Sequence, residues 1–403
     1  MLKVLKFGGT SVGTLDRIQN VANIIKKIKD EGHDVIAIVS AMSGETNKLL
    51  DYAGYYSKTP KLDEVDMLLS SGERVTSALL SIALNEMGYK AMSMSGRQAG
   101  IITDNAHTKA RIENIDTAEM KKAIKDGNII IVAGFQGVAQ DTLRVSTLGR
   151  GGSDLTAVAI AGAIEADVCE IYTDVDGIYT TDPRIEPKAK KLDKISYDEM
   201  LELASLGAKV LQNRSVEMAK KLNVNLVSRS SFTPEVEGTL ITKEENIMEK
   251  PVVSGIALDK NQIRVGMYGV TDRPGIASAI FTALADANIN VDMIVQTRGL
   301  DGTTDLDFTI PTTDFEICKK VMEQFKAQAK NIDYNESICK VSIVGVGMKS
   351  HTGVASKAFT AMANENINIR IISTSEIKIS MIIDEKYAEL AVRALHEAYH
   401  LDK

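Results

Sequence analysis

The segments Lys6-Phe7-Gly8-Gly9-Thr10-Ser11 and Gly149-Arg150-Gly151-Gly152-Ser153-Asp154 lie far apart in the chain. The first follows a short apolar run, and the second opens a long apolar helical pattern. Both offer backbone N–H groups with no bulky side chain in front of them, which is what a phosphate group requires. Each also carries a cation, Lys6 or Arg150. If the two segments meet in space, they predict a site that holds a nucleotide beside an anionic acceptor, as phosphoryl transfer requires.

Outward from these segments, residues 1–245 alternate short apolar strands with helical patterns, and we expect them to form one domain. Buried strands are expected at residues 4–7, 34–40 and 168–173. Such alternation predicts an α/β fold with a mostly parallel sheet between layers of helices. Ligands bind these sheets at the carboxyl ends of the strands, where both the first glycine turn and Asp174 fall.

The C-terminal part of the chain contains an internal repeat. Residues 275–290, GIASAIFTALADANIN, recur as residues 353–368, GVASKAFTAMANENIN, each copy between two predicted strands. This order predicts two ferredoxin-like α+β units. The second unit lacks residues for its last strand, so we expect it to combine residues 252–258 with 339–403, with the first unit, 263–338, inserted between them. The alternative is that 252–258 is a linker strand.

Composition limits the classes of partner. The 403 residues include 47 basic and 54 acidic side chains, a net charge of −7, which argues against non-specific binding to nucleic acid or anionic membranes. Cys169, Cys318 and Cys339 lack the spacing of a disulfide framework or metal site, and the five histidines lack metal-ligand spacing. No apolar run approaches the ~18 residues of a membrane span, and the N-terminus lacks a secretory apolar region. We therefore expect a cytoplasmic protein with buried, reduced cysteines.

The first glycine segment is not a Walker P-loop, because its lysine precedes the glycines rather than following them. Lys6 stands at the end of a predicted strand. We expect Lys6 to reach the transferred phosphoryl group while Gly8 and Gly9 approach it with their amides.

The second segment combines a cation with two side chains at the start of a helix. Arg150 can bind a carboxylate through two parallel hydrogen bonds. Asp154, if close to Lys6, would keep that ammonium group charged and oriented. Ser153 and Asp154 are also favoured helix caps, and this simpler role is compatible with the first.

Two further segments carry weaker signals. Asp174 and Asp176 follow a predicted strand, where they could contact adenosine or only form a turn. Ser71-Gly72-Glu73-Arg74 interrupts a helical pattern over residues 65–87, and Glu73 could bind a substrate ammonium group.

Taken together, these motifs resemble the aspartate-phosphorylating branch of the amino acid kinase family, and the resemblance runs essentially from end to end. The two C-terminal units resemble the ACT domains of that branch. The matching segments are KFGGTSVG (6–13), SAMSGETN (40–47), SGER (71–74), GRGGSD (149–154), YTDVDGIYTTDPR (172–184), GAKVLQNRSVEMA (207–219) and STSEI (373–377).

The resemblance implies transfer of the γ-phosphate of Mg²⁺·ATP to the β-carboxylate of L-aspartate, the first step towards lysine, threonine, methionine and diaminopimelate. It implies that Lys6 and Asp154 are catalytic. It implies aspartate binding by Thr46, Glu73, Arg150 and Ser153, and nucleotide binding by Lys6, Gly8, Gly9, Thr173, Asp174, Tyr179, Arg184 and Lys209.

The resemblance also implies that the ACT units bind lysine and/or threonine as feedback inhibitors and join copies of the chain into a homo-oligomer. The implied effector residues are Asp272, Gly275, Gln296, Asn368 and Ile369. The second copy has Lys349-Ser350-His351 where the first has Thr271-Asp272-Arg273-Pro274, so the two effector sites should differ. A purely structural dimerisation module is the alternative.

Two other functions compete with this expectation. The chain could be another amino acid kinase, acting on glutamate, acetylglutamate or a nucleotide, although the ACT pair and SGER argue against it. It could also be an amino-acid sensor with a silent kinase-like domain, which the intact Lys6, Arg150 and Asp154 disfavour.

Overall fold

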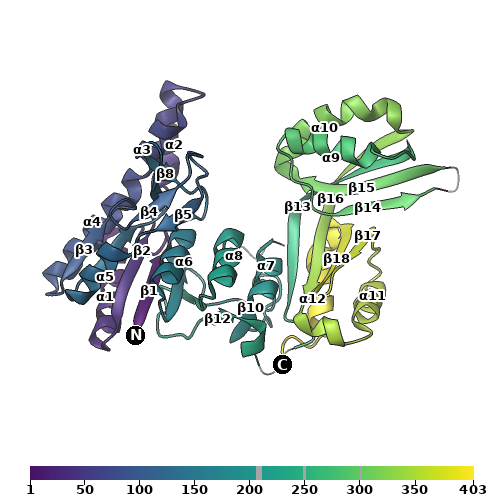
Figure 1. The fold of residues 1–403 in the computed structure, drawn as a ribbon. Coiled ribbons are helices and arrows are strands. Elements are labelled where there is room, and N and C mark those ends of the chain that lie inside the picture. Colours follow the sequence, from purple (N-terminus) through teal and green to yellow (C-terminus); the bar gives the residue numbers. More distant parts are fainter. Residues whose placement is uncertain (206–210, 248–250, 300–301) are drawn as a thin grey trace. The chain divides into compact units, whose positions relative to one another are not determined.

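The computed structural model describes residues 1–205, 211–247, 251–299 and 302–403. The chain divides into two compact units, and most of their helices and strands are labelled in Figure 1. The first unit contains Met1–Ile178, Lys191–Ala204 and residues 211–247. The second contains Tyr179–Lys190, Ser205 and the described residues from 251 to 403.

The first unit is built on an eight-stranded sheet with the order β10-β12-β11-β9-β1-β2-β6-β3. The central strands run parallel to one another, and β12 pairs with β11 in the antiparallel sense. This arrangement, with the C-terminal unit described below, confirms the predicted fold class. The strands are β1 (Leu2–Phe7), β2 (Asp34–Val39), β3 (Ala91–Met94), β6 (Ile129–Ala133), β9 (Val168–Thr173), β10 (Lys194–Ser196), β11 (Leu226–Ser230) and β12 (Thr239–Thr242).

Helices cover both faces of this sheet. α1 (Leu15–Asp30) and α4 (Ser71–Glu86) share a hydrophobic cluster with Leu5 and Ala37. Ile38 points to the opposite face, because successive side chains of a strand alternate. There a Cβ atom added to Gly134 would lie 2.9 Å from both Ile38 and Ser153 of α6 (Gly152–Ile164). α6 therefore covers the second face, and it packs against α8 (Asn213–Leu222).

The helical stretch predicted over residues 65–87 is two helices rather than one, α3 (Leu62–Leu69) and α4. The hydroxyl groups of Ser70 and Ser71 donate to backbone carbonyls three residues earlier, at 3.0 and 2.6 Å. Such side-chain bonds compete with regular helix formation. The break places Glu73 in the first turn of α4.

A small sheet of order β5-β4-β7-β8 precedes the second glycine segment in the chain. Its last strand, β8 (Val145–Thr147), ends immediately before Leu148 and Gly149. The other strands and helices of this unit are β4 (Ile101–Thr103), β5 (Ile112–Ile115), β7 (Gln136–Ala139), α2 (Glu45–Tyr56), α5 (Ala118–Lys125) and α7 (Tyr197–Ser205).

The second unit is an antiparallel six-stranded sheet with the order β14-β15-β13-β16-β18-β17. Its strands are β13 (Gly255–Thr271), β14 (Ile294–Arg298), β15 (Thr303–Pro311), β16 (Asn331–Val344), β17 (Ile371–Thr374) and β18 (Lys378–Asp384). Its helices are α9 (Ile276–Asp286), α10 (Phe315–Met322), α11 (Val354–Asn364) and α12 (Ala388–Ala398).

Two hydrophobic clusters divide this unit. Ile263 and Phe308 pack with α9 and α10, whereas Ile256 and Met381 pack with α11 and α12. The strands predicted at 252–258 and 263–270 are therefore parts of one continuous strand, β13, which β16 pairs along both parts with shifts in register between 259 and 264. The domain boundaries assigned from the sequence stay a prediction.

The sequence repeat corresponds to α9 and α11. Each helix begins after a glycine with a left-handed backbone, Gly275 at φ 92° and Gly353 at φ 82°. Open space surrounds both positions, so it is the backbone conformation and not crowding that favours glycine there.

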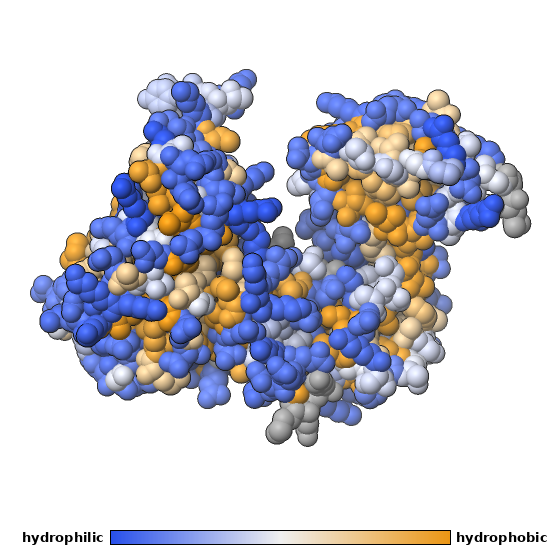
Figure 2. All heavy atoms as spheres, in the orientation of Figure 1, coloured by the Kyte–Doolittle hydropathy of each residue, from blue (hydrophilic) through white to orange (hydrophobic). Residues whose placement is uncertain are grey.

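Figure 2 shows hydrophilic side chains over much of the visible surface of each unit, with hydrophobic side chains between them. Within the described ranges, no helix is both long and apolar enough to cross a membrane. The three cysteines are buried and free, as predicted.

Candidate active site

The two glycine segments meet at one edge of the first unit's large sheet. The Lys6 Nζ atom, near the end of β1, lies 2.6 Å from the Asp154 Oδ1 atom in the first turn of α6. Each of these side chains is only 11% exposed. The predicted convergence of the two segments is therefore confirmed, while the catalytic roles of Lys6 and Asp154 stay predictions.

Gly8 contributes to this site in a different way from the one predicted. Its N–H group donates to the carbonyl of Tyr172 at 3.2 Å, because the β1–β9 ladder continues past Phe7. The prediction that this amide is offered to a phosphate is therefore wrong. Gly8 instead leaves space for the Lys6 side chain, since a Cβ atom at Gly8 would lie 3.3 Å from Lys6 Nζ. A Cβ atom at Gly9 would lie 3.1 Å from the carbonyl oxygen of Ala41.

Glycines also form the start of α6. Gly151, at φ 74°, is the N-cap, and no side chain caps the helix. The helix-cap alternative for Ser153 and Asp154 is therefore not what the structure has. Both residues lie in the first turn, each 8% exposed. The dipole of a helix favours an anion at this end.

Glu73 is a buried carboxylate with an unfilled hydrogen-bonding position. The residue is 3% exposed, and within the described part of the chain its Oε2 atom has no hydrogen-bond partner. Burial raises the pKa of Glu73 to about 7, against backbone hydrogen bonds at Glu73 and Ala41 that lower it. Ala41 follows β2, so Glu73 faces the same sheet edge as Lys6. A buried carboxylate of this kind suits a substrate cation.

The other predicted aspartate ligands flank these buried groups. Thr46 is half-buried in the first turn of α2, beyond a loop that lies close to Gly9. Arg150 is exposed in the turn that leads into α6. The structure thus brings a buried cation, two buried anions and an exposed guanidinium to neighbouring elements.

The predicted nucleotide ligands divide between the two units. Thr173 and Asp174 end and follow β9, beside β1. Tyr179 and Arg184 belong to the second unit, where Arg184 is 89% exposed in its side chain and pairs with Asp182 at 2.7 Å. Lys209 lies outside the described residues.

The segment that carries Tyr179 and Arg184 is fastened inside the second unit. The Thr180 hydroxyl is 3.0 Å from His396 Nε2 of α12, and the Thr180 carbonyl accepts from the Ile256 amide at 2.7 Å. Arg393 donates to the Ile185 carbonyl at 3.3 Å. Sequence periodicity gives no signal for this packing, because the partners are distant in the chain: His396 and Arg393 lie 216 and 208 residues from the groups that they contact.

The predicted effector residues lie at different places in the two repeats. Asp272 and Gly275 stand at the start of α9 and Gln296 lies on β14, whereas Asn368 and Ile369 follow α11. Asp272 lies between β13 and α9, and its carboxylate is 3.6 Å from Arg298 Nε. Gln296 is exposed on the edge strand β14. In the second copy, Lys349 lies 3.9 Å from Glu376, and Asn368 is exposed beside half-buried Ile369. Arg298 and Glu376 occupy equivalent positions of the repeat, so the two charged pairs have opposite polarity. Neither Arg298 nor Glu376 was among the predicted effector residues.

One further group was missed in the first unit. Arg214 of α8 donates to the carbonyls of Leu148 and Ala110, at 2.6 and 3.2 Å, and so holds the backbone just before the second glycine segment. Within the described ranges, no group of three His, Cys, Asp or Glu residues could hold a metal ion.

Comparison with known proteins gives consistent matches over the whole chain. The amino acid kinase family model matches residues 1–227, and ACT domain models match residues 264–330 and 341–399. A relative named aspartokinase from Helicobacter pylori (strain J99) is 59% identical over 407 residues, which cover all of both chains.

Two solved structures share the fold. One is E. coli aspartokinase III in complex with aspartate and ADP, with a TM-score of 0.82, 25% identity and 99% of each chain covered. The other is E. coli aspartokinase III in complex with lysine and aspartate, with a TM-score of 0.79, 26% identity, and 98% of this chain and 99% of that chain covered.

Proposed function

The chain belongs to the amino acid kinase family as an aspartate kinase with C-terminal ACT domains, and we propose that Lys6 and Asp154 form the centre of its phosphoryl-transfer site. The observation that carries this proposal is the buried contact between the two glycine segments. In the reaction, an oxygen of the aspartate β-carboxylate forms a bond to the γ-phosphorus of ATP. The bond to the bridging oxygen breaks, and ADP leaves with its electron pair.

The main barrier in this reaction is repulsion between two anions. A carboxylate is already ionised near pH 7, so no general base is required. Lys6 reduces the repulsion by placing a positive charge where negative charge accumulates in the transition state. Asp154 holds the ammonium group in position. The N-terminus of α6 adds N–H groups and a favourable dipole.

Aspartate offers three charged groups, and we assign a partner to each. Glu73, with its unfilled Oε2, binds the α-ammonium group. Arg150 binds the α-carboxylate with its planar fork of donors. Thr46 and Ser153 add hydrogen bonds, which leaves the β-carboxylate directed towards phosphorus.

The nucleotide lies, on this proposal, along the sheet edge formed by Gly8, Gly9, Thr173 and Asp174 of the first unit. The roles that the resemblance implies for Tyr179, Arg184 and Lys209 stay predictions. A bound ADP is present in the E. coli neighbour. Mg²⁺ prefers phosphate and carboxylate oxygens. Because Asp154 already pairs with Lys6, the ion would be held chiefly by the phosphates of ATP, with Asp154 beside it, and would neutralise phosphate charge.

The C-terminal unit, we propose, binds lysine and/or threonine as feedback inhibitors of the pathway that leads to lysine, threonine, methionine and diaminopimelate. Lysine is bound in the second E. coli structure. The Asp272–Arg298 and Lys349–Glu376 pairs have opposite polarity, so the two sites should not be equivalent. ACT pairing of copies into a homo-oligomer and a reduced cytoplasmic setting, consistent with three free cysteines, belong to the same proposal.

The experiment that tests this function is an initial-rate assay of ADP formation with ATP and L-aspartate, repeated with L-glutamate. Hydroxylamine in the assay converts an acyl phosphate into a hydroxamate, which identifies the product. We expect turnover and hydroxamate with aspartate, little with glutamate, and inhibition by added lysine or threonine. A protein that binds effectors without any turnover of ATP and aspartate would instead be a sensor.

A further inference from the structure

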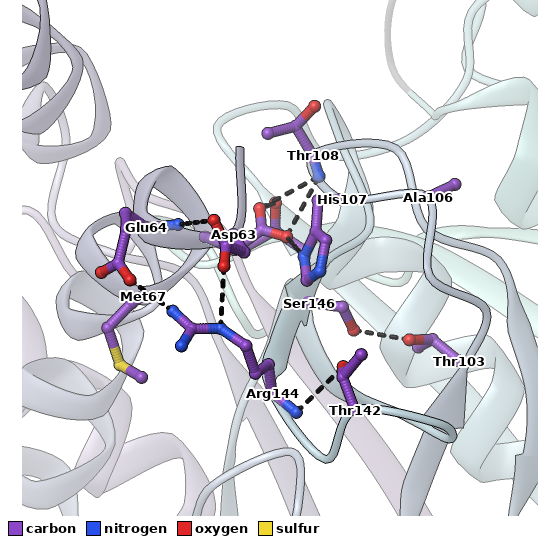
Figure 3. Close-up of polar contacts among 12 residues, drawn as sticks. Asp63, Glu64, Met67, Thr103, Ala106, His107, Thr108, Thr142, Arg144 and Ser146 are labelled. Carbon is purple, nitrogen blue, oxygen red and sulfur yellow. Dashed lines mark hydrogen bonds and ion pairs between the residues drawn. The ribbon is translucent and has the colours of Figure 1, made fainter. Parts of the chain in front are cut away.

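Asp66, on α3, is buried completely and its carboxylate is fully engaged. It accepts from His107 Nδ1 at 2.7 Å, from the Thr108 amide at 3.1 Å to each oxygen, and from the Thr147 hydroxyl at 2.5 Å. Figure 3 shows His107 and Thr108 turned towards this helix. A buried carboxylate is stable only when charge and hydrogen bonds satisfy it. No role was predicted for His107, because 41 residues separate it from Asp66.

The segment that Asp66 holds contains a strained residue. Thr108 has a φ of 68°, a left-handed conformation that is unfavourable for a β-branched side chain. Its N–H group is the donor that both oxygens of Asp66 accept. Such strain persists only where the surroundings fix it, and it gathers near functional sites.

The strained residue lies directly against the second glycine segment. A Cβ atom on Gly149 would lie 3.1 Å from the Thr108 carbonyl oxygen, so the two backbones are in close contact. On the other side, the Ala110 amide donates to the Thr147 carbonyl at 2.9 Å, and Arg214 bridges the carbonyls of Ala110 and Leu148. The backbone at Thr147–Gly149 therefore takes its position from the segment that Asp66 fixes.

We propose that Asp66 is a positioning residue for the aspartate-binding end of the site, acting through Thr108 and Thr147 on Gly149 and Arg150. This inference rests on the proposed role of Arg150 in binding the substrate α-carboxylate. Asp66 contacts no substrate itself. It holds the Thr108 backbone in its left-handed form, and Thr108 supports the turn from which Arg150 extends.

The test is a kinetic comparison of the full-length enzyme with its Asp66→Asn variant. We expect the KM for aspartate to rise about tenfold, with kcat changed by less than about threefold and the KM for ATP by less than about twofold. Asp63→Asn is the matched control, because Asp63 lies on the same helix and pairs with surface Arg144 at 3.1 Å (Figure 3). The control should retain every kinetic constant.

A second substitution separates positioning from general destabilisation. Glycine adopts a left-handed backbone without strain, so the double variant Asp66→Asn/Thr108→Gly should return the KM for aspartate to within about threefold of the unmodified value. If Asp66→Asn does not fold, Thr147→Val, which removes one donor at similar volume, should raise the KM for aspartate about threefold.

Several results would overturn the proposal. An active enzyme whose Asp66→Asn variant keeps its KM for aspartate overturns the positioning role alone. A similar impairment of kcat and of both KM values that Thr108→Gly does not restore also overturns the positioning role, because it indicates a merely structural role for Asp66. An unmodified protein without aspartate-dependent turnover overturns the proposed function, and this inference with it.

Discussion

The charged pair at the candidate active site and the charged pair at the predicted effector site differ in burial, and this difference indicates how each can act. In the first unit, Lys6 and Asp154 are each 11% exposed, so their geometry is set before any ligand arrives. In the second, Asp272 is 39% and Arg298 80% exposed at 3.6 Å. An exposed pair contributes little to stability and separates easily. The buried pair therefore suits the proposed phosphoryl transfer, and the exposed pair suits the proposed effector site, where a bound amino acid would replace one partner.

The largest expected effect comes from breaking the buried pair. Lys6→Ala should lower kcat by on the order of a thousandfold, because no other group replaces its charge at the transferred phosphoryl group. Circular dichroism and the melting temperature should show that the fold is kept. A near-normal kcat would remove Lys6 from the mechanism and with it the contrast between the two regions.

Glu73 tests whether an unfilled buried carboxylate is a ligand site. Its pKa of about 7 means that, as pH rises through 7, Glu73 ionises and gains affinity for the substrate ammonium group. The kcat/KM for aspartate should therefore rise through this range. Glu73→Gln should lower kcat/KM at about pH 8 by roughly a hundredfold and remove this pH limb. If the limb remains in Glu73→Gln, the titrating group lies elsewhere.

Arg150 provides an exposed group within the catalytic unit. Arg150→Ala should raise the KM for aspartate about tenfold, which is less than the effect at buried Glu73 because solvent weakens an exposed contact. The KM for ATP should change by less than about twofold. Equal increases in both KM values would contradict the assignment of Arg150 to aspartate.

Substitution of Asp272 should have the smallest effect on the activity of the uninhibited enzyme. Asp272→Ala should leave kcat and both KM values unchanged, and raise the concentration of lysine or threonine needed for half inhibition by about tenfold. Glu316→Ala is the control, since Glu316 is an exposed partner of Lys319 in the same unit. Unchanged inhibition in Asp272→Ala would reject the effector site.

The features that could be predicted from the sequence were periodic patterns, the internal repeat and short motifs of neighbouring residues. Strand and helix alternation predicted the parallel sheet, the repeat predicted two similar helices, and the glycine segments predicted the meeting of Lys6 and Asp154. A charged side chain beside consecutive glycines is an informative pattern, because few functions other than anion binding require this combination.

The features that were not predicted from the sequence depend on contacts between distant parts of the chain. The Gly8 amide is used because the β1–β9 ladder extends by one residue, which strand patterns do not reveal. Residues 255–258 of the strand predicted at 252–258 belong to the longer strand β13, because β16 pairs with β13 from Gly255 to Tyr268. The Asp66–His107 contact joins a helix to a loop, and neither residue shows periodicity or spacing that predicts it.

A crystal structure with L-aspartate and a non-hydrolysable ATP analogue bound would test the proposed active site. We expect the aspartate ammonium group on Glu73, its α-carboxylate on Arg150, and the β-carboxylate and γ-phosphate both within reach of Lys6 Nζ. Aspartate bound away from Glu73 and Arg150, or a γ-phosphate far from Lys6, would contradict it.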